Sequence, residues 1–571
     1  MKIKLKDREN ILIYLIIILI SVILLGPLIN LGTYVLGHDS LFHISNIIAI
    51  RETFSSGNWF LPKVYPLIAN GFGYGTGIFY GPLTHYFSAF INYLLPNFSV
   101  MTIMKLVHLL VILFSMVFMY QFVFKITNKK YVSLLSAVLY VTFPYFLSDI
   151  YVRDSFAESA SFVFIPLIFN GLYELIYLHN KKSFYKFFVF GVTGLVLTHT
   201  ITTVFTAFIV FLFLILNIKK IFSNKNYIYL IVSLFFILGM CLFYLVPIIE
   251  QYFLADINIF NNGSVSTAQT VSSYALSIGK LLPYSKNTSS DGIQFFILFP
   301  MLLLILFSLF QYPKIKNENK KVFLDFAIIG FLLLFMSTNL FPWEKMPSIL
   351  LYIQFPWRLL LFVDFCFSIF GIVCLLELKQ DFLKIVPIFL IVVFVINSTT
   401  LLNLDRISNY GESAVDVSLS GIGAVNDYLP TKVVQNYDYF QNRSSDVLIL
   451  EGEGDIEVLS YSAPFIKFDA QLNSDKLVLE LPLLYYYGYK VDNFLNYYGT
   501  ENGSGNENNQ KVIIEESPNG FVQLTIYTSG NYVINYVESN LSNVSLYISL
   551  ITFIGFFLFI QKRGSKYEKE K

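Results

Sequence analysis

Side chains suited to chemistry stand at four places where apolar stretches of the chain begin or end. Asp39 lies in Gly37-His38-Asp39-Ser40-Leu41-Phe42-His43, and the others are Arg153, Glu158, His199 and Arg358. A carboxylate can accept a proton from a hydroxyl group. Guanidinium groups bind phosphate oxygens in pairs. If the helices bring these residues into one cavity, we expect acid–base chemistry next to a bound phosphate.

Three histidines near Asp39 raise the question of a metal site. His38, His43 and His85 all fall within residues 31–100. His38 and His43 are five residues apart, whereas two ligands on one helix face are usually four apart. We therefore predict no zinc site and interpret His38 as a substrate contact. A divalent ion that acts together with Asp39 stays open as a cofactor.

The composition indicates the environment of these residues. Of 571 residues, 55% are hydrophobic and 13% are charged, whereas soluble domains have about 25% charged residues. The formal net charge of +1 gives no reason to expect a nucleic-acid partner. The chain is predicted to be a polytopic α-helical membrane protein in contact with membrane lipids.

Apolar stretches long enough to cross a bilayer recur along the chain. A span needs about 20 mostly apolar residues. We expect about twelve spans, at 11–30, 101–124, 132–149, 159–178, 184–200, 202–217, 227–248, 293–311, 322–337, 357–377, 382–400 and 544–560.

Basic residues predict how the spans are oriented. Lys and Arg gather at the N-terminus and in every second loop, at residues 2–8, 125–130, 181–186, 219–225, 314–321, 379–384 and 562–571. Such clusters mark cytoplasmic segments. Both termini are therefore predicted to be cytoplasmic, and the long loops 31–100 and 249–292 extracytoplasmic. Counting 79–95 as a span would reverse this pattern, so we interpret it as an interfacial or re-entrant helix.

Residues 401–542 differ in character from the rest of the chain. Polar and apolar residues alternate in Lys476-Leu-Val-Leu-Glu-Leu481 and Phe521-Val-Gln-Leu-Thr-Ile526, and Asn519-Gly520 is a turn signal. We predict three parts: a helical membrane domain at 1–400, a β-rich, sandwich-like extracytoplasmic domain at 401–542, and a final span with a basic cytoplasmic tail at 543–571.

Several motifs together resemble a known family. They are His38-Asp39-x-x-x-His43, Gly57-Asn58-Trp59, the glycine-rich Asn70–Gly77, Tyr80-Gly81-Pro82-Leu83, Tyr151-Val-Arg153 to Glu158, Gln354-Phe-Pro-Trp-Arg358, Tyr428-Leu-Pro430 and Leu481-Pro-Leu-Leu-Tyr-Tyr-Tyr-Gly488. The pattern resembles the bacterial membrane proteins labelled 6-pyruvoyl-tetrahydropterin-synthase-related. That family is similar in architecture to the C-type (GT-C) glycosyltransferases, which take a sugar from a polyprenyl-phosphate carrier and have an acidic residue in the first outer loop. Asp39 matches that position.

The resemblance implies an enzyme of the bacterial cell membrane. It implies an inverting glycosyltransferase that moves a sugar from a polyprenyl-phosphate donor to an envelope glycan or lipid acceptor. Asp39 would act on the acceptor hydroxyl, together with Glu158 and His199 as catalytic groups. His38, Arg153 and Arg358 would bind substrate. A transporter or flippase for a lipid-linked saccharide and a non-catalytic envelope-assembly protein remain alternatives.

Each candidate also has a purely structural interpretation. Asp39 fits a helix cap, and Arg153 fits an anchor for lipid phosphate. Glu158 fits an ion-pair partner of Arg153. Arg358, beside Trp357, fits an interfacial anchor, and His199 fits a polar residue between helices.

Overall fold

The computed structural model describes most of the chain. The described residues are 5–28, 34–55, 57, 59, 62–261, 267–282, 292–315, 319–379, 382–401, 407–408, 415–423, 426–493 and 512–569. Asn58 of the Gly57-Asn58-Trp59 motif lies outside them.

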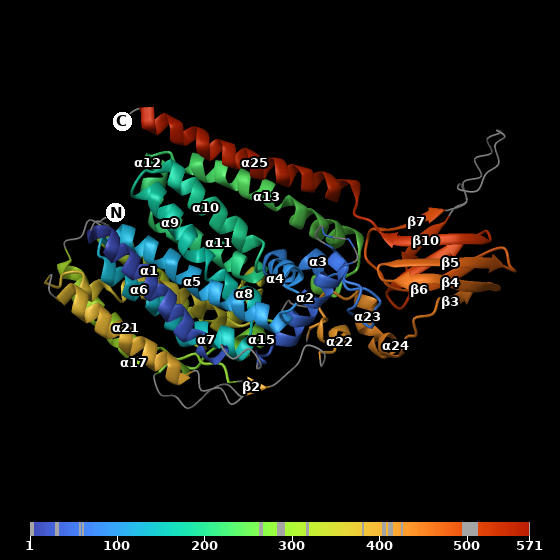
Figure 1. The fold of residues 1–571 in the computed structure, drawn as a ribbon, viewed down its shortest axis with the longest axis horizontal. Coiled ribbons are helices and arrows are strands. Elements are labelled where there is room, and N and C mark those ends of the chain that lie inside the picture. Colours follow the sequence, from blue (N-terminus) through green and yellow to red (C-terminus); the bar gives the residue numbers. More distant parts are fainter. Residues whose placement is uncertain are drawn as a thin grey trace.

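A bundle of helices forms the larger part of the molecule, and a β-sandwich stands at one end of it (Figure 1). Both termini lie at the opposite end of the bundle. Every predicted span overlaps one of the helices. These are α1 (Leu5–Leu24), α5 (Val100–Thr127), α6 (Lys130–Thr142), α9 (Phe164–Ile176), α10 (Lys181–Val196), α11 (Thr200–Leu216), α13 (Asn226–Leu254), α17 (Phe299–Gln311), α18 (Lys320–Met336), α20 (Leu360–Phe370), α21 (Phe382–Leu401) and α25 (Asn540–Lys569).

Helix length does not establish the predicted count of about twelve spans. Among the described residues, five helical segments are long and apolar enough to cross a membrane, or six if one bent pair is counted as a single span. Other apolar helices, such as α11 with 17 residues, are shorter than the roughly 30 Å hydrocarbon core at about 1.5 Å per residue. The structure therefore supports a multi-span helical protein without fixing the number of crossings.

The bent pair is the feature of the bundle that matters most for the site. The segment from α6 through α7 (Pro144–Ser148) to Arg153 bends by 45° at Phe143. Pro144 has no backbone N–H to donate to the preceding turn, so a helix breaks here readily. A π-helical turn, η2 (Asp149–Arg153), follows and ends at Asp154 in the left-handed conformation with φ 51°. The chain then continues into α8 (Phe156–Ser161) and α9.

The first long loop is itself largely helical. It contains α2 (Ser40–Ser55), α3 (Thr76–Phe79) and α4 (Pro82–Leu94). α4 lies within the segment predicted as an interfacial or re-entrant helix, and its 13 residues are fewer than a span needs. Its small and polar residues, such as Ser88 and Asn92, are buried, while Phe87 and Phe90 are exposed. A short pairing of β1 (Tyr34–Val35) with β2 (Ile407–Ser408) connects this loop to the C-terminal region.

The β-rich domain predicted near the C-terminus is confirmed as two four-stranded antiparallel sheets. Their strand orders are β4-β5-β10-β7 and β3-β6-β9-β8. The strands are β3 (Leu448–Glu451), β4 (Gly454–Ser462), β5 (Phe465–Leu472), β6 (Leu477–Leu484), β7 (Tyr489–Asn493), β8 (Ile513–Glu516), β9 (Phe521–Ile526) and β10 (Gly530–Tyr536). One apolar core takes side chains from both sheets, such as Phe468 and Leu524, which makes the pair a sandwich. Before the strands, residues 417–442 form the short helices α22 (Val417–Ser420), α23 (Thr431–Gln435) and α24 (Tyr437–Asn442).

The sandwich is joined to the helical body by specific hydrogen bonds. The side chain of Gln251 on α13 donates to the carbonyl of Tyr487 at 2.7 Å and accepts from the Tyr487 N–H at 3.0 Å. The Leu484 N–H donates to the Phe72 carbonyl of the first loop at 3.0 Å. These bonds connect the first loop, α13 and the sandwich into one body.

A buried ion pair fixes α24 against the sandwich. Glu480 on β6 is fully buried, and it accepts from Arg443 at 3.1 Å, Tyr439 at 2.6 Å and Ser517 at 2.7 Å. Removing one partner of a buried pair leaves the other charge without compensation, at a cost of about 3–5 kcal/mol.

We predict that Glu480→Ala lowers the melting temperature of the purified full-length protein, because Arg443 is left buried without its carboxylate. Thermal unfolding in detergent measures the effect. Glu457→Ala, on the exposed face of β4, is the matched control and should change stability by no more than about 0.5 kcal/mol. Equal melting temperatures for both variants would contradict this interpretation.

Candidate active site

Asp39 is positioned by backbone pairing with the π-helical turn. The N–H of Asp39 donates to the Arg153 carbonyl at 2.8 Å, and the N–H of His38 donates to the Val152 carbonyl at 3.1 Å. Gly37 makes this approach possible, because a Cβ atom there would lie 2.6 Å from the Arg153 carbonyl carbon. Any larger residue at position 37 would push the Asp39 segment away from Arg153.

The Asp154 carboxylate connects the π-helical turn to the segment around Asp39. Its Oδ2 accepts from Tyr34 at 2.9 Å and from Ser40 at 2.5 Å, and its Oδ1 lies 2.9 Å from Nε2 of His108. The left-handed backbone of this residue, which Asp tolerates better than most residues, directs the carboxylate toward these partners. Sequence reasoning did not select Asp154 as a site residue.

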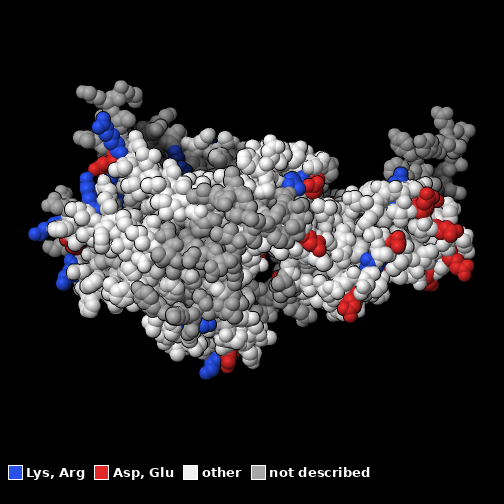
Figure 2. Space-filling model, turned by 60° about the horizontal axis from the view of Figure 1, so that its bottom comes forward, with Lys and Arg blue, Asp and Glu red and all other residues white. Residues whose placement is uncertain are grey.

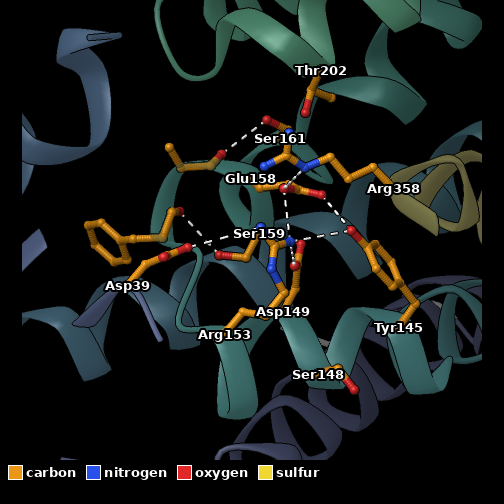
Figure 3. Close-up of polar contacts among 12 residues, drawn as sticks. Asp39, Tyr145, Ser148, Asp149, Arg153, Glu158, Ser159, Ser161, Thr202 and Arg358 are labelled. Carbon is orange, nitrogen blue, oxygen red and sulfur yellow. Dashed lines mark hydrogen bonds and ion pairs between the residues drawn. The ribbon is translucent and has the colours of Figure 1, made fainter. Parts of the chain in front are cut away.

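Arg153 is the centre of the charged cluster (Figure 3). Its Nη1 donates to Asp149 at 2.5 Å, to Glu158 at 2.9 Å and to the Tyr145 hydroxyl at 3.3 Å. Its Nη2 lies 4.0 Å from the Asp39 carboxylate. The guanidinium carbon also stacks 4.9 Å from the centre of the Trp357 ring. The side chain is therefore fixed in position from several sides, with its Nη2 toward Asp39.

Glu158 joins the two arginines. Its Oε2 accepts from Arg153 and lies 3.4 Å from Nε of Arg358, and its Oε1 accepts from Tyr145 at 2.6 Å. Arg358 also donates through Nη1 to the Gln354 side chain at 2.6 Å. Figure 3 shows the Glu158 carboxylate between the two guanidinium groups. The structure thus brings together Asp39, the neighbouring residues Arg153 and Glu158, and Arg358, from three separate parts of the chain.

Exposure separates Asp39 from the rest of the cluster. Its side chain is 44% exposed, compared with 6% for Arg153, 12% for Arg358 and 1% for Glu158. Partial burial is the main cause that raises the pKa of Asp39, and the positive charges of Arg153 and Arg358 oppose it. Asp39 is the acidic member of this cluster that an incoming molecule can reach.

Two predicted site residues lie at the edge of this cluster. His199 is the N-cap of α11, where its Nδ1 accepts from the Thr202 N–H, at 3.4 Å, and lies 2.7 Å from the Thr202 hydroxyl. His38 is exposed. Its established contact is the backbone bond to Val152.

The histidines of the first loop form a pair. Nδ1 of His43 lies 2.7 Å from Nε2 of His85, and the Phe156 N–H donates to the other ring nitrogen of His43 at 3.3 Å. Within the part of the chain that the structure describes, no group of three His, Cys, Asp or Glu residues is arranged to hold a metal ion. The cluster around Arg153 is built from ion pairs and does not fit a metal centre, so no step of the chemistry is assigned to a metal.

Two carboxyl groups, one of them the Arg153 partner Asp149, are buried with oxygens left unpaired by the described residues. Asp149 and Asp364 are fully buried. Oδ2 of Asp149 and both carboxyl oxygens of Asp364 have no hydrogen-bond partner among the described residues. The sequence could have indicated the Asp149–Arg153 ion pair, because the two residues are spaced i, i+4 as on one helix face.

The sequence gives no sign that the Tyr145 hydroxyl contacts Glu158 and Arg153, because that contact depends on the bend at Pro144.

The chain is similar in sequence to one curated protein. No family model matches the chain. An uncharacterized protein of Lactococcus lactis subsp. cremoris (strain MG1363) is 27% identical over 347 residues, which are 59% of this chain. The chain spans about half of that relative, 55% of its length. The resemblance to the 6-pyruvoyl-tetrahydropterin-synthase-related family is therefore not shown and stays a prediction.

Solved structures of membrane glycosyltransferases are also similar. The arabinofuranosyltransferase AftD from Mycobacteria matches with a TM-score of 0.44 and 12% identity, over 71% of this chain and 28% of its own. ArnT from Cupriavidus metallidurans bound to undecaprenyl phosphate matches with a TM-score of 0.44 and 13% identity, over 76% of this chain and 81% of its own. The apo form of ArnT gives 0.43 and 12%, over 73% and 77%. Likeness at this level carries no argument about activity.

We predict that Asp154→Ala destabilises the protein, because it removes the acceptor for Tyr34, Ser40 and His108. An unpaired buried hydroxyl costs about 1–3 kcal/mol. Melting temperature in detergent measures the loss. Asp154→Asn keeps one acceptor oxygen and tolerates the left-handed backbone, so its loss should be smaller. An alanine variant as stable as the wild type would show that Asp154 does not hold the segments together.

Proposed function

We propose that this protein is a membrane glycosyltransferase that moves a sugar from a polyprenyl-phosphate carrier to a cell-envelope acceptor at the extracytoplasmic face. The observation that carries the proposal is a partly exposed carboxylate, Asp39, 4.0 Å from the buried guanidinium of Arg153. A proton acceptor for a hydroxyl group and a fixed positive charge for a phosphate stand side by side. Glu158 and Arg358 of the same cluster lie near the first residues of two candidate membrane spans, which start at Phe156 and Pro356.

The reaction follows from this arrangement. The Asp39 carboxylate takes the proton of the acceptor hydroxyl, whose oxygen forms a bond to the anomeric carbon of the sugar. The bond between that carbon and the phosphate oxygen breaks, and the lipid phosphate leaves with the bonding electrons. Attack from the opposite side inverts the anomeric centre. Arg153 and Arg358 stabilise the charge that develops on the leaving phosphate.

The ion pairs around Glu158 serve this chemistry by positioning. Glu158 binds both arginines, so the two guanidinium groups stay in place before the phosphate arrives. Charges fixed in advance stabilise a transition state without reorganisation. Glu158 is therefore a positioning residue in the proposal. His199 stands beside it as a helix cap, and His38 stands at the exposed rim.

We further propose about twelve spans, with both termini in the cytoplasm and the sandwich outside. The distribution of charge supports this orientation. In Figure 2, Lys and Arg are concentrated at the end of the helical body away from the sandwich, whereas Asp and Glu are more frequent on the sandwich. Cytoplasmic segments of membrane proteins are enriched in Lys and Arg.

We predict that Asp39→Asn lowers transfer by about 10²–10⁴-fold, because an amide of the same size cannot take the proton. Incubation of the purified protein with radiolabelled polyprenyl-phosphate sugars and envelope acceptors measures incorporation. Glu52→Gln, an exposed change on helix α2, which begins directly after Asp39, is the matched control and should leave transfer unchanged. Full transfer by Asp39→Asn would remove Asp39 from the mechanism. Movement of the intact lipid-linked saccharide across proteoliposomes without incorporation would favour the transporter alternative.

We predict that Arg358→Gln moves the acidic limb of the pH–rate profile to higher pH. The positive charge of Arg358 lowers the pKa of Asp39, so its removal raises that pKa and the carboxylate is protonated at a higher pH. The position of the limb is the readout, since the rate itself also falls when phosphate binding weakens. Arg358→Lys keeps the charge and should shift the limb less. A limb that does not move in Arg358→Gln would mean that Asp39 is not the titrating base.

A further inference from the structure

A cavity of about 490 Å³ lies where the sandwich meets the helical body, at a place that the proposed reaction does not use. Its walls come from the end of α13, the start of α25 and the turn between β6 and β7. The residues that matter are Glu250, Tyr485, Tyr487, Tyr489, Lys490 and Ser539. The volume falls in the usual range of small-molecule sites, about 300–1,000 Å³.

The turn that carries the tyrosines is rigidly held. Gln251 makes two hydrogen bonds to the backbone of Tyr487, at 2.7 and 3.0 Å. Gly488 has φ 135°, and a Cβ atom there would lie 2.8 Å from the Tyr536 ring, so the tight turn requires glycine. The backbone is therefore fixed while the Tyr487 side chain stays partly exposed, at 37%. A binding surface built in this way needs little ordering when a ligand arrives.

The polar groups of the cavity are also in place. Glu250 accepts from the hydroxyls of Ser539 and Ser542, both at 2.5 Å. This fixes its carboxylate at the start of α25. Tyr489 has a buried hydroxyl group that lacks a hydrogen-bond partner among the described residues. Tyr489 lines the cavity and also belongs to the apolar core of the sandwich, so this buried hydroxyl group is not counted among the ligand contacts.

We propose that this cavity binds a carbohydrate. Tyrosine rings offer flat apolar faces with a hydroxyl group at the edge, and sugar rings present apolar C–H faces edged with hydroxyl groups. The carboxylate of Glu250 and the ammonium group of Lys490 are an acceptor and a donor for such hydroxyls. Their charges cancel, which disfavours a phosphate or other anion. The charged groups of Glu250 and Lys490 in the wall disfavour an acyl chain.

The position of the cavity fits a sugar near a membrane surface. Exposed apolar residues continue from it along both helices, including Tyr252 and Phe253 on α13 and Tyr547 on α25. The cavity therefore opens at the sandwich end of an apolar surface. Its wall residue Tyr486 accepts from the Gly75 N–H of the first loop at 3.1 Å and donates to the Tyr428 carbonyl at 2.8 Å. Tyr486 therefore connects the cavity wall to the loop that carries Asp39, but the inference does not depend on transfer.

The test is direct binding by the purified full-length protein in detergent. The probe is a panel of fluorescently labelled oligosaccharides of hexoses, deoxyhexoses and N-acetylhexosamines, and phospholipid vesicles without sugar form a second arm. We expect at least one oligosaccharide to bind, and Tyr487→Ala to weaken that binding at least tenfold. Tyr527→Ala is the matched control, because Tyr527 is an exposed tyrosine of the sandwich outside the cavity.

Three results would overturn the inference. They are no binding of any oligosaccharide by the wild type, equal binding by wild type and Tyr487→Ala, and Tyr487-dependent binding to the sugar-free vesicles alone. Since Asp39→Asn leaves the cavity intact, sugar binding by that variant separates this inference from the proposed reaction. Loss of transfer with retained binding in this variant supports both proposals. Transfer by the wild type without binding of any oligosaccharide refutes only the cavity.

Discussion

Arg153, held in place by Asp149 and Glu158, is the interaction on which the arrangement of the site depends. A guanidinium group in a nearly dry environment is tolerable only with carboxylates beside it. Asp149 and Glu158 supply them at 2.5 and 2.9 Å. All three residues stand on one short stretch of the chain. The break at Pro144 and the π-helical turn bring the side chains of Asp149 and Glu158 to the guanidinium group of Arg153. Distant segments then add the exposed Asp39 and the second arginine.

This construction explains why the first loop and the helix break need each other. The backbone of residues 38–39 pairs with residues 152–153, and the Asp154 carboxylate binds Tyr34, Ser40 and His108. Without the loop, the carbonyl groups of Val152 and Arg153 and Oδ2 of Asp154 would lose these partners. Without the turn, Asp39 would have no guanidinium group beside it. The buried ion pairs thus hold the guanidinium group of Arg153 in place, and the partly exposed Asp39 carboxylate can be reached by an incoming molecule.

The sequence predicted the parts of this structure that follow from local patterns. Apolar runs marked the helices, and alternation in Lys476–Leu481 and Phe521–Ile526 marked two strands that are β6 and β9. The ends of apolar runs pointed to Asp39, Arg153, Glu158 and Arg358, which the fold does bring together. The sequence could not predict the roles of Asp154 and Tyr145. The role of Asp154 depends on its left-handed backbone, and that of Tyr145 depends on the bend at Pro144, and only tertiary packing selects these features. Glu480 likewise lies on a strand whose alternation gives no sign of Arg443, which comes from outside the strand and pairs with it.

In the proposed reaction, the guanidinium groups of Arg153 and Arg358 bind a lipid phosphate next to Asp39. The most direct measurement is a cryo-electron microscopy structure of the full-length protein in lipid nanodiscs with added polyprenyl phosphate. We expect phosphate density within hydrogen-bond distance, about 3 Å, of Arg153 or Arg358. This density should lie on the side of the cluster that faces the Asp39 carboxylate. Polyprenyl phosphate bound elsewhere, with the ion pairs of both arginines unchanged and nothing beside Asp39, would contradict it.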